Sequence, residues 1–237
     1  MEFVRKKWGI PIKDVWFNES GNSAGFSLIK IAYNLYTPMS APKGLILKQW
    51  KSQTLISDIS VSPEEIQAKF KSKVRNEIRR AVKEGVTTQI YSSSKLLENN
   101  IIDSFDKAYI AMYRDKGQKA KSIATRLLGI AAAGNLNISV ASLPDGTIAS
   151  WHSYVVGDGV ARLLHSVSVF REEPEKRKMI GWANRLLHFE DMCTFGRDGL
   201  GVYDWGGISR QEKMRNITRF KEEFGGIEKV VYYCALL

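Results

Sequence analysis

The chain has 237 residues, of which 44% are hydrophobic and 25% are charged, with 35 Lys and Arg against 25 Asp and Glu. This length and composition predict a globular protein of one large or two small domains, able to bury a core without covalent staples. Two cysteines and three scattered histidines match neither a disulfide scaffold nor a metal-ligand spacing, which argues against metal catalysis.

The net charge of +10 favours anionic partners, which include nucleic acid, acidic membranes and small phosphorylated ligands. No apolar stretch approaches the roughly 20 residues that a membrane helix needs. No apolar run of signal-peptide length follows the basic residues at 1–13. We therefore expect a cytoplasmic protein in which Cys193 and Cys234 are reduced thiols.

The first 85 residues are predicted to hold strands and then one helix. β-Branched and aromatic runs indicate strands over 24–36, 44–50 and 54–59. Ser62, Pro63 and Glu65 form a capping box that should begin a helix, and Gly85 should end it. The buried stripe predicted on that helix recurs every four residues: Ile66, Phe70, Val74, Ile78 and Val82.

The middle of the chain alternates between helical and strand patterns. We predict a strand at 86–91, an amphipathic helix at 95–115 and a second helix at 122–133. The inward face of the first of these helices carries Ile101, Phe105, Ala108 and Met112. Three strands follow, at 137–143, 147–156 and 160–170, joined by the hairpin sequences Pro144-Asp145-Gly146 and Gly157-Asp158-Gly159. They should form an antiparallel meander.

The last third is predicted to add a helix at 178–195, a short strand at 200–205, another helix and a closing strand at 227–237. A capping box, Ser209 with Glu212, should begin the later helix, whose inward residues are Met214, Ile217, Phe220 and Phe224. The fold class is therefore α/β, with a mixed, mostly antiparallel central sheet flanked by helices. We divide the chain into a β-rich segment with a basic helix, 1–85, packing on or completing the main sheet, and a core, 86–237.

The loop at 171–179 is basic, and small residues, Gly181 and Ala183, follow it near the start of a helix. Unpaired backbone N–H groups and the helix dipole make such a place a natural phosphate or pyrophosphate site. The alternative is a basic loop on a basic protein, with Gly181 serving only packing.

Four blocks of residues resemble a known superfamily. Lys178-x-x-Gly181-x-Ala183 resembles the Q/R-x-x-G-x-G/A motif with which GNAT N-acyltransferases bind the pyrophosphate of coenzyme A. The blocks at 73–85, 203–208 and 220–226 resemble the FemAB-like branch of that superfamily; they contain Arg75, Arg79, the run Tyr203-Asp204-Trp205-Gly206-Gly207, and Phe220-Lys221. The chain is shorter than the two-domain FemAB-type enzymes. The resemblance implies a GNAT-like fold with an extra β-rich N-terminal segment.

Short FemAB-like proteins resemble sugar N-acyltransferases. The implied reaction moves an acyl group from acyl-CoA to the amine of a nucleotide-linked amino sugar, in surface-polysaccharide (lipopolysaccharide) synthesis, without a metal. The resemblance implies that coenzyme A is bound by Arg177, Lys178, Gly181 and Ala183, and that a backbone N–H at Val167, Ser168 or Val169 polarises the thioester. The alternatives are an aminoacyl-tRNA donor with a peptidoglycan-precursor acceptor, and a non-catalytic nucleic-acid-binding module.

Amide formation needs a base for the amine and a donor for the leaving thiolate. Asp204 is the first candidate to take the proton or anchor the amine, because it precedes Gly206 and Gly207, where a ligand can approach the backbone; the alternative is that it braces the turn. His165 is the second candidate base, unless it is a core histidine. The resemblance implies that Tyr203 protonates the thiolate.

Further candidates would bind the substrate. Trp205 could stack on a sugar or base, Lys221 lies near the end of its helix, and Arg75 and Arg79 at i and i+4 could grip phosphates. The alternatives are a buried tryptophan and a solvated basic helix face. His152 is a weaker candidate for catalysis, and we place His188, with Asn184 and Asp191, on a solvated helix face.

Overall fold

The computed structural model describes residues 1–7, 10–17, 29–36, 46–169 and 174–236. Within these ranges ten strands form one sheet in the order β1-β2-β3-β10-β4-β9-β8-β7-β6-β5. The strands are β1 (Glu2–Lys7), β2 (Ile10–Trp16), β3 (Ile29–Leu35), β4 (Ile46–Asp58), β5 (Thr87–Ser92), β6 (Leu136–Ser142), β7 (Ile148–Gly157), β8 (Val160–Ser168), β9 (Val202–Ile208) and β10 (Ile227–Leu236). Parts of the predicted strands, 24–28, 44–45, 170 and 237, and the predicted loop residues 171–173, lie outside the described residues.

The helices are α1 (Pro63–Ala68), α2 (Ser72–Lys83), α3 (Ser93–Glu98), α4 (Ile101–Asp115), α5 (Ala124–Ala132), α6 (Arg177–Arg197) and α7 (Arg215–Glu222), with short 3₁₀ turns at Pro174–Lys176 and Glu212–Met214. In the described part, no helix combines the length and the apolar character that crossing a membrane requires.

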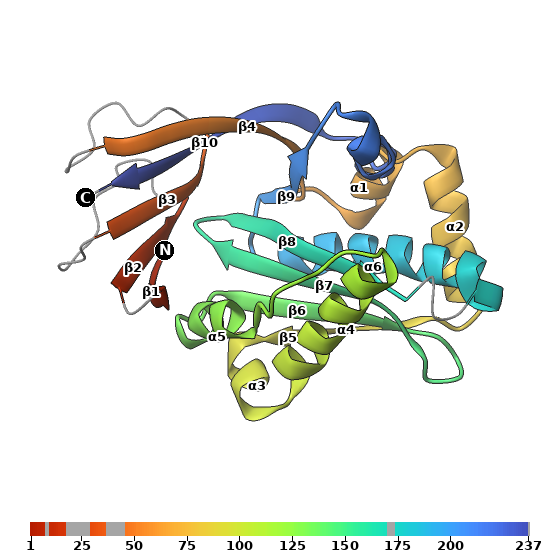
Figure 1. The fold of residues 1–237 in the computed structure, drawn as a ribbon. Helices are drawn as coiled ribbons and strands as arrows, with labels where there is room; N and C mark the ends of the chain where they lie inside the picture. Colours follow the sequence, from red (N-terminus) through yellow and green to blue (C-terminus); the bar gives the residue numbers. More distant parts are fainter. Residues whose placement is uncertain (8–9, 18–28, 37–45, 170–173, 237) are drawn as a thin grey trace.

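Neighbouring strands are antiparallel except in two pairs, β2–β3 and β8–β9, which are parallel. This confirms the predicted α/β class with a mixed, mostly antiparallel sheet. The meander β6–β7–β8 has the predicted antiparallel order. β10 lies between β3 and β4, so the sheet runs from the N-terminal strands into the helix-flanked part without a break (Figure 1). The division at residue 85 stays a prediction.

The capping box at Ser62 is confirmed, but the helix that follows is interrupted. Ser62 Oγ accepts a hydrogen bond from the Glu65 amide at 3.2 Å, and the Ser62 amide donates to the Glu65 carboxylate at 3.0 Å. The chain then leaves the helix between α1 and α2. Val82, predicted to be buried, is 60% exposed, and Ala81 is buried instead. A stripe of period four drifts around a helix of 3.6 residues per turn, so its last member rotates out of the core. The predicted helix at 95–115 is likewise divided, into α3 and α4.

The second predicted capping box is wrong. Ser209 Oγ accepts from the Gln211 amide at 3.2 Å, and its backbone is tied to the Thr218 hydroxyl, so α7 begins only at Arg215. The shorter helix has a different inward face. Phe224 is buried as predicted, whereas Ile217 is 47% exposed and Thr218 is buried.

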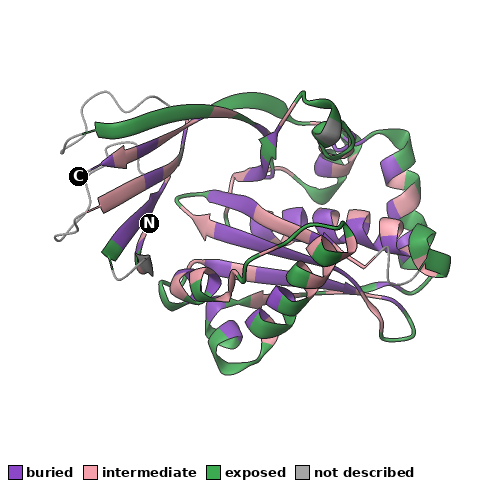
Figure 2. Cartoon of the chain, in the orientation of Figure 1, coloured by how far each residue is buried: buried purple, intermediate pink, exposed green. Residues whose placement is uncertain are grey.

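Figure 2 shows buried positions along β6 to β9 and on the helices beside them, and most of the buried apolar side chains form two clusters. One cluster joins α1, α2 and α6 to the sheet; it includes Ile66, Val74, Ile180, Leu187, Trp205 and Phe224. The other lies under α3, α4 and α5 and includes Leu96, Phe105, Leu127, Ile138 and Trp151. Burying both faces fixes β8 and β9 in the middle of the sheet, and the candidate site lies where these two strands separate.

Candidate functional site

The parallel pair β8–β9 is short. Its register covers only Val160–Arg162 against Val202–Asp204. Beyond Arg162, β8 continues to Ser168 alongside β7 but not alongside β9 within the described residues. The backbone edge of β8 that faces β9 is therefore open from about Leu163 onward.

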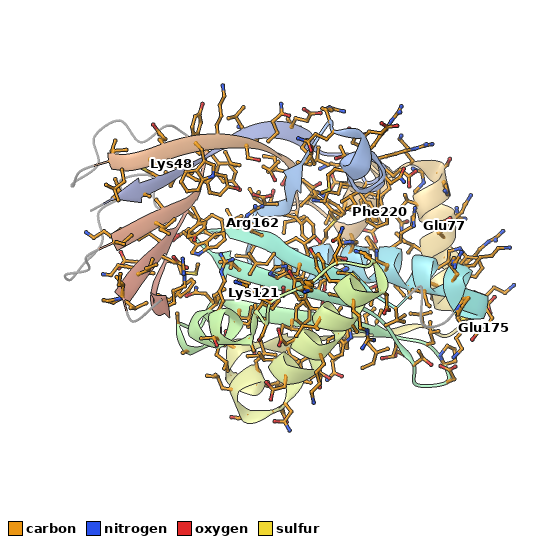
Figure 3. The ribbon with its side chains drawn as sticks, in the orientation of Figure 1. Lys48, Glu77, Lys121, Arg162, Glu175 and Phe220 are labelled. Atoms are coloured by element: carbon orange, nitrogen blue, oxygen red, sulfur yellow. The ribbon has the colours of Figure 1, made fainter. Side chains whose placement is uncertain are left out.

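Two cavities, each of about 420 Å³, adjoin this open edge. We name them cavity A, lined by β8, α4, α6 and α7, and cavity B, lined by β8, α5 and the N-terminal strands. The two cavities share five residues as their common wall: Leu163, Ser166, Trp205, Ile217 and Lys221. Figure 3 labels Arg162, which lines cavity B, and Phe220, which lines cavity A. No group of three or more His, Cys, Asp or Glu side chains in the described ranges is placed to hold a metal ion.

Asp204 is fully buried at the end of the β8–β9 pairing and lines neither cavity. Its Oδ1 accepts hydrogen bonds from Arg162 Nη1 and from the Gly206 amide, each at 2.8 Å, and from the Thr54 hydroxyl. Its Oδ2 accepts from the Tyr36 hydroxyl at 3.2 Å. These contacts fit the bracing role that we set beside the catalytic one, because the carboxylate neutralises a buried guanidinium and holds the turn.

The turn after Asp204 requires glycine. Gly206 has φ +74°, and a Cβ at this position would lie 2.9 Å from the Leu163 carbonyl oxygen. This close approach of β9 to β8 brings the neighbouring Gly207 carbonyl to Lys221.

Lys221 of α7, which we predicted to bind substrate, lies in the common wall of the two cavities. Its Nζ donates to the Gly207 carbonyl at 2.8 Å. Burial and, next, the charge of Arg162 lower the pKa of Lys221 to about 8, against the opposing effect of Asp204. The ammonium is therefore close to its titration point at physiological pH.

His165 lines cavity B, where it packs edge-on against Tyr109 of α4 with 5.0 Å between the ring centroids. Burial, and to a smaller extent Arg126, lower the pKa of His165 to about 4, so it is neutral at physiological pH. The predicted catalytic Tyr203 is fully buried and lines neither cavity. Its hydroxyl belongs instead to a buried polar chain between α6 and the sheet.

That polar chain connects α6 with β7 and β9. The Tyr154 hydroxyl donates to Asp191 Oδ2 at 2.6 Å, lies 2.8 Å from the Tyr203 hydroxyl, and the Tyr203 hydroxyl lies 2.7 Å from His188 Nδ1. His152 lies beside the chain, with Nδ1 2.8 Å from Asp191 Oδ2. The prediction that His188 is solvated is wrong, because it is 1% exposed and lines cavity A.

The spacing of polar residues in the sequence of α6 indicates this hydrogen-bond chain, although our prediction did not use it. Asn184, His188 and Asp191 are spaced by four and three residues, which places them on one helix face. The apolar residues of α6 are distributed all around the helix. Such a helix has no polar half that could face the solvent. A polar stripe on such a helix is therefore buried, and its members must bond to one another or to the sheet.

Of the residues predicted to bind coenzyme A, some line cavity A and the others line neither cavity. Ser168 and Val169 line cavity A, whereas Val167 is buried on the other side of the strand. Arg177 and Lys178 are exposed at the start of α6, where Gly181 is half-buried and Ala183 joins the core; none of these four lines either cavity.

Of the remaining residues predicted to bind the substrate, Trp205 lines both cavities, whereas Arg75 and Arg79 line neither. Trp205 is fully buried, donates from its indole N–H to Ser57 Oγ at 3.0 Å, and forms part of the common wall. Arg75 donates to the Phe70 carbonyl and Arg79 to Asn76 Oδ1 at 2.6 Å, and neither arginine lines a cavity. Both arginines thus bond to neighbouring residues of the chain, and their binding of phosphates stays a prediction beside the alternative of a solvated basic helix face.

The β8 backbone shows which amides face the open edge. The Val169 amide donates to the Ala149 carbonyl of the β7 side at 3.2 Å. Because alternate residues of a strand direct their N–H groups to opposite edges, Ser166 and Ser168 direct theirs away from β7, toward the cavities. Among Val167, Ser168 and Val169, the position able to polarise a bound carbonyl is therefore Ser168.

Comparisons with known proteins show the fold. No protein-family model matches the sequence, and no curated protein matches it by sequence. Among solved structures, FemX aligns with a TM-score of 0.64 at 10% identity, over 100% of this chain and 84% of that one. The C-terminal domain (DUF2156) of a protein assigned as a lysylphosphatidylglycerol synthetase from Agrobacterium fabrum aligns with a TM-score of 0.57 at 14% identity, over 99% and 80%. L-PGS from Bacillus licheniformis aligns with a TM-score of 0.55 at 11% identity, over 98% and 79%. The chain thus shares the fold of FemX, a mixed, mostly antiparallel sheet flanked by helices.

Proposed function

We propose that this protein transfers an acyl group from an activated donor in cavity A to the amine of an anionic acceptor in cavity B. The observation that carries the proposal is the common wall of the two cavities, at the open edge of β8 beside Lys221. Two substrates that enter from opposite sides can meet there, with their reacting atoms held together.

Cavity A suits the donor. Its lining is largely apolar, from residues such as Met112, Val169 and Phe220, which fits an acyl chain or the arm of a thioester. The open amide of Ser168 offers a fixed N–H to the carbonyl oxygen as negative charge develops on it. Arg177 and Lys178 at the start of α6 support coenzyme A as the carrier, because a helix N-terminus with cations attracts a pyrophosphate.

Cavity B suits an anionic acceptor. Arg126, Arg162 and Lys221 line it, and Arg126 lies over the rings of Trp16 and Tyr33 at 5.8 and 5.5 Å from their centroids. Buried N–H groups of these side chains, namely Trp16 Nε1, Arg126 Nε and Arg162 Nε, have no hydrogen-bond acceptor among the described residues. Phosphate oxygens would satisfy such donors, and the aromatic rings fit a base or sugar. We propose a nucleotide-linked amino sugar as this acceptor.

Lys221 would stabilise the negative charge that develops on the leaving group. As the amine nitrogen bonds to the carbonyl carbon, the bond from that carbon to the carrier sulfur breaks and the electron pair stays on sulfur. An ammonium between the two cavities stabilises this developing anion. Its lowered pKa, about 8, leaves it charged in most molecules at neutral pH.

A second candidate keeps the chemistry and changes the carrier. One neighbour of similar fold is assigned as a lysylphosphatidylglycerol synthetase, a name that denotes transfer of a lysyl group. Here the donor would be an aminoacyl ester on tRNA, and the net charge of +10 would contribute to binding.

Calorimetric titration distinguishes the carriers. We expect coenzyme A to bind the wild-type protein saturably with a stoichiometry of one, and Ala108→Trp to abolish the binding because the indole fills cavity A, which Ala108 lines. Leu128→Trp, on an exposed position of α5, is the matched control and should bind as wild type. Salt-sensitive binding of charged tRNA without binding of coenzyme A would replace the first carrier with the second. Equal affinity in Ala108→Trp would contradict the placement of the donor.

A further inference from the structure

His188 ends a hydrogen-bond chain that fixes where its protons lie. The chain starts at Asp191, whose Oδ2 accepts hydrogen bonds from the Tyr154 and Ser139 hydroxyls. Tyr154 therefore directs its single proton to Asp191 Oδ2, across 2.6 Å. With that proton committed, the Tyr154 oxygen accepts from the Tyr203 hydroxyl, across 2.8 Å. The order of donors along the chain is thus set from its carboxylate end.

The same reasoning determines the tautomer of His188. Tyr203 has used its proton toward Tyr154, so its oxygen accepts from His188 Nδ1–H, across 2.7 Å. A neutral imidazole with its proton on Nδ1 carries a lone pair on Nε2. No described residue donates to Nε2, and His188 lines cavity A. Nε2 is therefore the bare ring nitrogen of His188, the one that takes no part in the hydrogen-bond chain.

The surroundings keep His188 neutral. Burial, His152 of β7 stacked at 3.9 Å, Lys221 of α7 and Arg185 of α6 all lower the pKa of His188 well below its ordinary value. Trp205 of β9 packs on the same ring at 4.8 Å and belongs to the wall shared with cavity B. Asp115 of α4 and Lys116, which follows that helix, are the other charged groups that line cavity A. The imidazole is thus a neutral base beside the place where the two substrates would meet.

We propose that His188 carries the proton of the transfer reaction, an inference that rests on the proposed function. The amine nitrogen bonds to the carbonyl carbon and gives one proton to His188 Nε2. The bond from carbon to the carrier then breaks, and the departing sulfur or oxygen takes that proton from Nε2. The products are the amide and the protonated carrier, and His188 returns to its neutral Nδ1–H form. Tyr203, Tyr154 and Asp191 are positioning residues that hold the tautomer.

The tautomer can be measured without any substrate. The protein has three histidines, so labelling with nitrogen-15 histidine gives few ring signals. The signals that are missing in His188→Gln assign that residue. We expect His188 to show a protonated Nδ1 and a bare Nε2, unchanged from roughly pH 6 to 8. Tyr203→Phe should shift His188 toward a mixture of tautomers, whereas His165→Gln, which removes a ring outside the polar chain, should leave it unchanged. A protonated Nε2 in the wild-type protein would overturn the proposal.

Kinetics separates this inference from the proposed function. With acetyl-CoA as donor and hydroxylamine as the amine probe, His188→Gln should lower kcat about 10²-fold and leave the KM for acetyl-CoA close to wild type. Wild-type kcat in this variant would overturn the role of His188 even though transfer is real. If the wild-type protein releases no thiol from acetyl-CoA, the coenzyme A donor fails, and the tautomer measurement still decides whether His188 can accept a proton.

Discussion

Asp204→Ala should lower the free energy of unfolding by about 3–5 kcal/mol, because it leaves the Arg162 guanidinium buried and without its carboxylate. The substitution also removes the acceptor of the Gly206 amide and one of the two acceptors of the Thr54 hydroxyl, which keeps the Gly206 carbonyl at 2.8 Å. Urea unfolding of the variant against the wild-type protein measures the effect from the shift in midpoint.

Two further variants test whether the unpaired charge of Arg162 causes the loss of stability in Asp204→Ala. Glu98→Ala, on an exposed carboxylate of α3, is the control and should change stability by less than about 0.5 kcal/mol. Adding Arg162→Met to Asp204→Ala should recover part of the loss, because no buried charge then stands alone. A loss below about 1 kcal/mol in Asp204→Ala would show that the contacts of Asp204 do not brace this turn.

Lys221→Met should reduce kcat by about 10²–10³-fold, since it removes the cation expected to stabilise the leaving group while keeping the length of the side chain. The pH profile provides a second test. Because the ammonium is the active form and its pKa is lowered to about 8, the rate of the wild-type protein should fall above that pH. This alkaline decline should be absent from the residual activity of Lys221→Met.

Lys51→Met, on the exposed surface of β4, is the matched control for the loss of one positive charge. It should keep the wild-type rate and the wild-type pH profile. A rate that rises through pH 8 in the wild-type protein but not in Lys221→Met would mean that the neutral amine of Lys221 is the active form, and the role assigned to the ammonium would then be wrong.

The elements that could be predicted from the sequence are those with local causes. The turns Pro144-Asp145-Gly146 and Gly157-Asp158-Gly159 specify hairpins by themselves, and the meander of β6, β7 and β8 follows from them. The capping box at Ser62 depends on residues three apart. The inward face of α7 could not be predicted in this way, because the Thr218 hydroxyl, nine residues away, holds the backbone of Ser209 and delays the helix.

The site was only partly predictable, for a related reason. Lys221 and Trp205 stood in recognisable motifs, and both line the shared wall. Cavity B joins Trp16 of β2, Tyr33 of β3 and Arg126 of α5, which meet because β10 pairs with β3 and β4 and because α5 packs against β1. Single-sequence patterns do not encode such long-range pairing. His188 was misplaced because the polar stripe that it forms with Asn184 and Asp191 lies on a helix with no polar half, a pattern that the prediction did not use.

The most direct test of the account is whether an amine is acylated. The wild-type protein would be incubated with acetyl-CoA and a panel of nucleotide-linked amino sugars, in parallel with aminoacyl-tRNA as donor, and the amine product would be identified by mass spectrometry. We predict an N-acylated acceptor together with one equivalent of released carrier, greatly reduced in Lys221→Met and unchanged in Lys51→Met. Absence of any acylated amine with either donor, from protein that binds coenzyme A or charged tRNA, would contradict the claim that the two cavities serve one transfer reaction.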